Sequence, residues 1–120
     1  MSLRTCYEAL GGDYDAVLGR LPSERLVQKF VLKFLQETSY NDLVAAMRAK
    51  DGEAAFRAAH TIKGVCLNLS FDRLHASSDR LCEALRHGWT DDAPALAEAV
   101  DADYAQTIAA INALKAELGI

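Results

Sequence analysis

Apolar residues recur at intervals of three and four along most of this chain, and that period restricts its fold more than any other feature of the sequence. The long periodic stretches are rich in Ala, Leu, Glu and Arg, which favour helices, and no run of alternating β-branched residues indicates a strand. Both prolines, Pro22 and Pro94, lie at or near the starts of such stretches, where a helix tolerates them. The pattern predicts an all-α protein.

Four long helices are predicted, and their short connections make them antiparallel neighbours in an up-and-down four-helix bundle. The first begins after Ser23, a suitable N-cap, but its apolar stripe loses register near Thr38. That segment is either one bent helix or two helices that meet, and we expect one bent helix ending near Ala49. The four helices are expected at residues 23–49, 51–68, 71–87 and 92–119.

Residues 1–22 are too few to form a separate domain. Helical spacing predicts a helix from Leu3 to Leu10 that is stopped by two glycines, and residues 13–18 are expected to form a turn. We expect residues 1–22 to be a short N-terminal helical cap over one end of the bundle, which takes residues 23–119. A chain of 120 residues can bury about two-thirds of its unfolded surface, so residues 1–120 are expected to form a single domain.

Charge and composition exclude several classes of partner. The net charge is −4 and no basic run occurs, which argues against nucleic acid. No apolar stretch approaches the roughly 20 residues that span a bilayer, and no apolar signal region follows the start, so we expect no membrane contact and a cytoplasmic location. The three cysteines share no C-x-x-C spacing, which suits a reducing compartment and predicts neither a disulfide framework nor a zinc site.

The second predicted helix carries the residues with chemical potential. At about 100° per residue, one side of it is apolar and must face the core, while His60 lies on the opposite side. Gly64, one turn further on, costs roughly 1 kcal/mol relative to alanine, and it leaves room beside the imidazole. Lys63 supplies a flexible cation suited to a phosphoryl oxygen. A neutral imidazole is a competent nucleophile. The same face holds Phe56, Arg57 and Leu67.

These residues resemble a known family. The H-x-x-K-G pattern of the histidine phosphotransfer (HPt) domain is similar to the segment Ala58-Ala59-His60-Thr61-Ile62-Lys63-Gly64, and its downstream turn is similar to Asn68-Leu69-Ser70-Phe71. The resemblance extends from about Leu26 to His87 and implies a phosphocarrier in a two-component phosphorelay rather than an enzyme.

The resemblance assigns roles residue by residue. It implies that His60 accepts the phosphoryl group, that Lys63 stabilises its charge and that Gly64 gives access. Partners would be response-regulator receiver domains, a hybrid histidine kinase, or both, and Phe56, Arg57 and Leu67 are expected to contact a receiver. The receiver would bring its own Mg²⁺, so we expect no cofactor and no metal in this chain. We also expect a monomer.

Two positions depart from the family pattern. Ser70 stands where the turn commonly has glycine, and Cys82 stands where Gln or Glu often bonds the imidazole. Cysteine is a poor hydrogen-bond acceptor, so the orientation of His60 would rely on another group or on water. Candidates at a similar level of the third helix are Ser78, Asp79 and Glu83.

Other interpretations remain open at this stage. The same scaffold could bind a receiver or kinase without being phosphorylated. It could also be a small enzyme or a ligand-binding bundle, although few polar residues fall on the predicted core. Phe56 and Leu67 could pack against the first helix instead of forming an interface.

Overall fold

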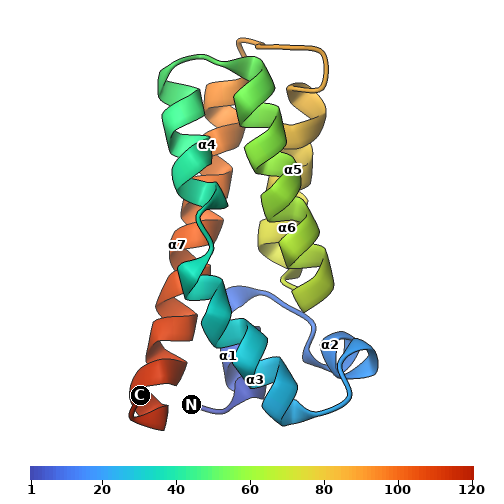
Figure 1. Ribbon diagram of the computed structural model, residues 1–120, viewed down its shortest axis with the longest axis vertical. Helices are drawn as coiled ribbons and strands as arrows, with labels where there is room; N and C mark the ends of the chain where they lie inside the picture. Colours follow the sequence, from blue (N-terminus) through green and yellow to red (C-terminus); the bar gives the residue numbers. More distant parts are fainter.

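The computed structural model describes residues 1–120 and contains α-helices and one 3₁₀ helix but no strand (Figure 1), which confirms the all-α prediction. In chain order the elements are α1 (Leu3–Leu10), α2 (Tyr14–Arg20), α3 (Glu24–Lys33), η1 (Phe34–Gln36), α4 (Ser39–Arg48), α5 (Gly52–Leu69), α6 (Asp72–Ala84) and α7 (Ala93–Leu118).

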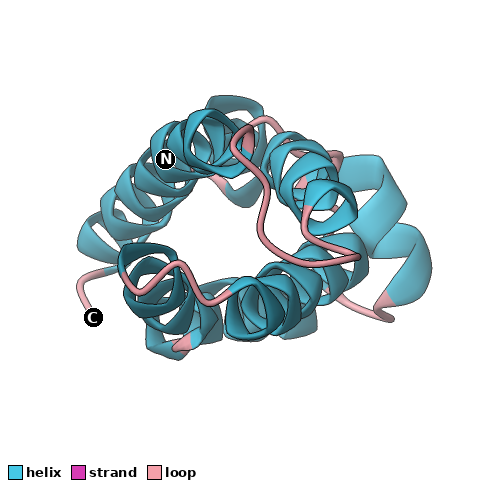
Figure 2. Ribbon diagram, turned by 90° about the horizontal axis from the view of Figure 1, so that it is seen from above, coloured by secondary structure: helices cyan, strands magenta, loops and turns pink.

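The helices α4, α5, α6 and α7 form the antiparallel bundle. Only Ser70 and Phe71 separate α5 from α6, so these two helices form a tight antiparallel hairpin. Helix α4 packs against the outer side of this hairpin along α5, and α7 packs along α6 and runs the length of the molecule (Figure 1). Seen end-on, the helices surround a common centre (Figure 2). The up-and-down bundle that the sequence predicts is therefore confirmed.

The N-terminal helices complete the other end of the molecule. Helix α1 packs against the C-terminal half of α7, and α2 connects it to α3 (Figure 1). Residues 14–18, part of the segment expected to be a turn, instead belong to α2, because the Asp13 side chain accepts a hydrogen bond from the Ala16 amide and caps a new helix (3.0 Å). The predicted turn is wrong, but a helical cap is present.

The expectation of one bent helix over residues 23–49 is also wrong. Helix α3 gives way to η1, and Glu37 then adopts an extended backbone with ψ of 129° before α4 begins at Ser39. The Glu37 carboxylate accepts hydrogen bonds from the Ser39 amide (3.2 Å) and hydroxyl (2.6 Å). These bonds satisfy donors at the start of α4, so a second helix start is stabilised there.

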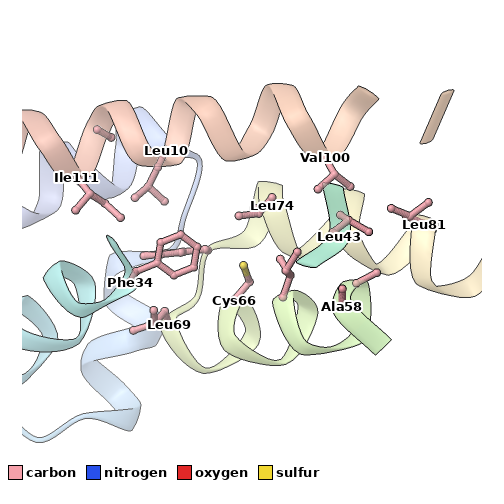
Figure 3. Packing of buried hydrophobic residues seen from close by; sticks show 14 of the residues in the cluster. Leu10, Phe34, Leu43, Ala58, Cys66, Leu69, Leu74, Leu81, Val100 and Ile111 are labelled. Atoms are coloured by element: carbon pink, nitrogen blue, oxygen red, sulfur yellow. The ribbon is translucent and has the colours of Figure 1, made fainter. Parts of the chain in front are cut away.

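An aromatic cluster fills the junction between the bundle and the N-terminal helices. Phe34 is only 4% exposed and packs edge-on against Phe71, with ring centroids 5.2 Å apart. Tyr7 also packs against Phe71, with ring centroids 5.5 Å apart, and its hydroxyl donates a hydrogen bond to the Leu69 carbonyl (2.8 Å). Figure 3 shows Phe34 beside Leu69 and Cys66 in this core. The cluster fixes the hairpin end of α5, and so the position of the helix that carries His60.

Helix α6 ends at Ala84 rather than near His87, because hydrogen-bonded turns replace the helix there. Helix α7 begins close to its predicted start and carries a proline in its first turn. None of the helices combines the length and the hydropathy that a membrane span requires.

Candidate functional site

Helix α5 holds His60 on its outward face. Asp51 caps the helix by accepting a hydrogen bond from the Ala54 amide (3.1 Å). The inward face is buried, and it consists of Ala55, Ala58, Ala59, Ile62, Cys66 and Leu69. The helical spacing predicts this face except at two positions, because Val65, expected in the core, is only partly buried, whereas Ala59 is buried. Figure 3 shows Ala58 and Cys66 pointing into the core. His60 lies on the other side of the helix and is exposed, so its imidazole is accessible from solvent.

Gly64 has no structural neighbour that requires a glycine. It is exposed, its φ is not positive, and a Cβ built on it meets no atom within 4 Å. Glycine in a helix interior nevertheless costs roughly 1 kcal/mol relative to alanine. The internal packing of the fold therefore gives no reason for the glycine, and open space lies next to His60.

Lys63 reaches across to α6. Its Nζ lies 3.2 Å from the Oδ1 of Asp79, and its side chain is 22% exposed, compared with 45% for Asp79. Asp79 was one of the residues that the sequence suggested as a hydrogen-bond partner for His60. The structure pairs it with Lys63 instead.

Cys82 faces the imidazole from α6. Its Sγ lies 4.0 Å from the Nδ1 of His60, and the residue is completely buried. Burial raises the pKa of the Cys82 thiol, although the nearby cations of Lys63 and Arg86 oppose the shift. The sulfur is therefore a neutral thiol at neutral pH and makes only a long, weak contact with the ring. The other ring nitrogen, Nε2, has no hydrogen-bond partner in the protein.

The three residues predicted to contact a receiver, Phe56, Arg57 and Leu67, lie in different environments. The Phe56 ring stacks against His60 (6.0 Å between centroids, 18° between planes) and is partly buried against the core. Leu67 is 54% exposed. Arg57 is exposed and pairs with Glu53 at 2.7 Å. All three belong to α5, and of these Arg57 and Leu67 are exposed.

From the sequence, Arg86 is expected to reach solvent, with a role in holding phosphate or a receiver left open, and the structure places it beside the ring of Phe56. Its guanidinium lies 5.5 Å from the centroid of the Phe56 ring and pairs with Glu83 through two hydrogen bonds. The Arg86 partner lowers the pKa of the Glu83 carboxyl. The three-residue spacing of Glu83 and Arg86 predicts their pairing. The contact with Phe56 depends on how α6 is rotated against α5, which spacing along one helix does not show.

The turn after α5 accommodates serine at the position of the family's glycine. Ser70 adopts a left-handed backbone (φ 57°, ψ 40°) and is buried. Its hydroxyl accepts a hydrogen bond from Nη1 of Arg20 (2.7 Å), which also donates to the Leu67 carbonyl (2.5 Å). The Phe71 amide bonds the Cys66 carbonyl (2.9 Å), which closes the helix end. The turn therefore stays tight despite the substitution.

Of the three residues considered for orienting His60, none bonds it. Asp79 is paired with Lys63, Glu83 is paired with Arg86, and the buried Ser78 hydroxyl has no partner. No group of three or more His, Cys, Asp or Glu side chains lies close enough together to hold a metal ion.

Comparison with family models matches the Hpt domain over residues 30–117. The match includes the bundle helices, the α5–α6 hairpin and His60. Searches of curated proteins and of solved structures gave no significant match. Hpt domains are phosphocarriers that interact with receiver domains or histidine kinases. Because the match covers most of its length, the chain belongs to the Hpt domain family, the phosphotransfer modules of two-component signalling.

Proposed function

We propose that this chain is a histidine-containing phosphocarrier that receives a phosphoryl group on His60 and passes it to a receiver domain. The donor is the phosphoaspartate of another receiver, or a histidine kinase module. The single observation that carries the proposal is an exposed imidazole beside a helical glycine whose missing side chain leaves open space. We further propose that the protein acts as a monomer in the cytoplasm.

The geometry favours Nε2 as the attacking atom. Nδ1 faces Cys82 at 4.0 Å, whereas Nε2 has no partner in the protein. With the proton on Nδ1, the lone pair of Nε2 is free to attack phosphorus in line with the bond that breaks. The new N–P bond forms as the P–O bond to the donor aspartate breaks, and the bonding pair leaves on the carboxylate. The Mg²⁺ of this chemistry belongs to the partner receiver.

Lys63 and Gly64 assist the transfer in different ways. The Lys63 ammonium lies one turn from His60 on the same helix, where it can neutralise oxygens of the transferred group. Gly64 keeps the approach to the imidazole open. Phe56 and Leu67 provide apolar surface for the receiver, with Arg57 at the edge. Such an arrangement of apolar centre and charged rim is typical of protein interfaces.

The decisive test exposes the purified chain to receiver domains that carry a radiolabelled aspartyl phosphate. We expect an acid-labile, base-stable label on the wild-type chain and none on His60→Ala. The matched control is His87→Ala, since His87 is also exposed but lies after α6. Its labelling should equal that of the wild type.

The same experiment separates this function from a non-phosphorylated interaction module. A module of that kind would bind the receiver without acquiring label, and His60→Ala would bind as well as the wild type. Receiver binding without label would overturn the phosphocarrier proposal.

A further inference from the structure

We propose that Asp79 competes with the phosphoryl group for Lys63 and thereby weakens the hold of this site on phosphate. The inference deepens the proposed function and rests on it for its biological meaning. The chemical competition itself is testable on the isolated chain. Asp79 acts as a positioning residue, because its effect passes through the ammonium of Lys63.

The pairing of Lys63 with Asp79 is one-to-one. The Nζ–Oδ1 distance is 3.2 Å, and neither side chain forms another ion pair or side-chain hydrogen bond. Lys63 is 22% exposed, so its ammonium is held along the α5–α6 groove rather than extended into solvent. Partial removal from water makes such a pair stronger than a fully exposed one.

The second cation near the site is also neutralised. Arg86 is bound to Glu83 through two hydrogen bonds while it lies over the ring of Phe56. Lys63 and Arg86 therefore each have a carboxylate partner on α6 in the absence of phosphate. A phosphoryl dianion on His60 has to draw Lys63 away from Asp79 before the ammonium can neutralise the phosphoryl oxygens.

This competition suits a carrier that must release its phosphoryl group. A cation committed wholly to the phosphoryl oxygens would stabilise the phosphohistidine and oppose its transfer onward. Removing the charge of Asp79 by Asp79→Asn frees Lys63 and leaves the residue size nearly unchanged. We expect this variant to accept phosphate faster and to hold it longer.

The test uses phosphoramidate, a small N-phosphoryl donor that requires no partner protein. Its P–N bond breaks as the N–P bond to His60 forms, and ammonia leaves. Intact-mass measurements follow the appearance of phospho-His60. We expect Asp79→Asn to be phosphorylated about fivefold faster than the wild type, which corresponds to an ion pair worth about 1 kcal/mol.

A double-mutant cycle shows whether the effect passes through Lys63. In the Lys63→Ala background, Asp79→Asn should change the rate by less than about twofold, because most of the competition has been removed. The control Asp72→Asn removes the same charge from the exposed start of α6 and should leave the rate unchanged. The advantage of Asp79→Asn should also shrink in about 1 M salt, which screens exposed charges.

Equal rates for Asp79→Asn and the wild type would overturn the inference. An equal gain in the presence and absence of Lys63 would overturn it too, since Asp79 would then act by direct repulsion. Circular dichroism checks that each variant remains folded. Failure of the phosphocarrier function would appear separately. In that case phosphoramidate would label the chain, but no phosphorylated receiver would transfer its phosphoryl group to it.

Discussion

Gly64 separates the stability of the fold from its function, because its replacement by alanine should improve the first and impair the second. The position is exposed within α5, and a Cβ built there meets no atom within 4 Å. Alanine is favoured over glycine in a helix interior by about 1 kcal/mol. Since no contact opposes that gain, Gly64→Ala should raise the free energy of unfolding by about 1 kcal/mol. The thermal midpoint should rise by about 3–5 °C for a domain of this size.

The effect on phosphotransfer has the opposite sign. A side chain at position 64 stands one turn from His60 on the same face, where the receiver must approach. The methyl group of Gly64→Ala should slow transfer modestly. The branched side chain of Gly64→Leu should slow it about 100-fold, since a displacement of about 1 Å at the reacting atoms is enough to cause such a loss.

Gly19 provides a matched control for this prediction. It lies within α2, is exposed, and has no atom within 4 Å of a built Cβ. Gly19→Ala should therefore raise stability without changing the transfer rate. The assay combines thermal unfolding with single-turnover transfer from a phosphorylated receiver. Destabilisation by Gly64→Ala, or wild-type transfer by Gly64→Leu, would refute the reasoning that the glycine serves access alone.

Three further expectations concern the end of α5, the core and the docking surface. Ser70→Gly relieves a left-handed backbone but loses the hydrogen bond from Arg20, so the free energy of unfolding in urea should be nearly unchanged in the wild-type background. In an Arg20→Ala background, where that bond is already absent, Ser70→Gly should raise the free energy of unfolding by about 1 kcal/mol. Equal effects in both backgrounds would contradict this. Burial raises the pKa of the Cys66 thiol to about 12, so iodoacetamide at pH 8 should label it only after unfolding, as intact mass will report; rapid labelling of the folded chain would exclude the described core. Leu67→Asp should weaken receiver binding about tenfold in a titration, whereas Leu118→Asp, also exposed but at the far end of α7, should not.

The helical period was sufficient to predict α5 and the outward direction of His60. Which face of a helix is apolar, and therefore buried, follows from the spacing of apolar residues within that helix alone. The break before α4 does not follow from this spacing, because apolar residues recur at helical spacing both before and after it. The start of α4 depends on the Glu37 carboxylate, which binds the amide and hydroxyl of Ser39 from a position outside the helix.

Contacts between helices explain what sequence reasoning missed in the site. Spacing placed Asp79 and Cys82 near the level of His60, but it could not show that Asp79 would bond Lys63. Whether Asp79 bonds Lys63 or His60 depends on the rotation of α6 about its own axis. Similarly, the accommodation of Ser70 depends on Arg20, which lies 50 residues earlier in the chain.

The most direct measurement of the central claim locates the phosphorus atom itself. The chain is labelled with ¹⁵N in its histidines, phosphorylated by a receiver, and examined for coupling between nitrogen and phosphorus by NMR. We predict a single coupled nitrogen, Nε2 of His60, and no such signal from His60→Ala. Phosphorus on His75 or His87, or a chain that receives no phosphorus from any receiver that binds it, would contradict the account.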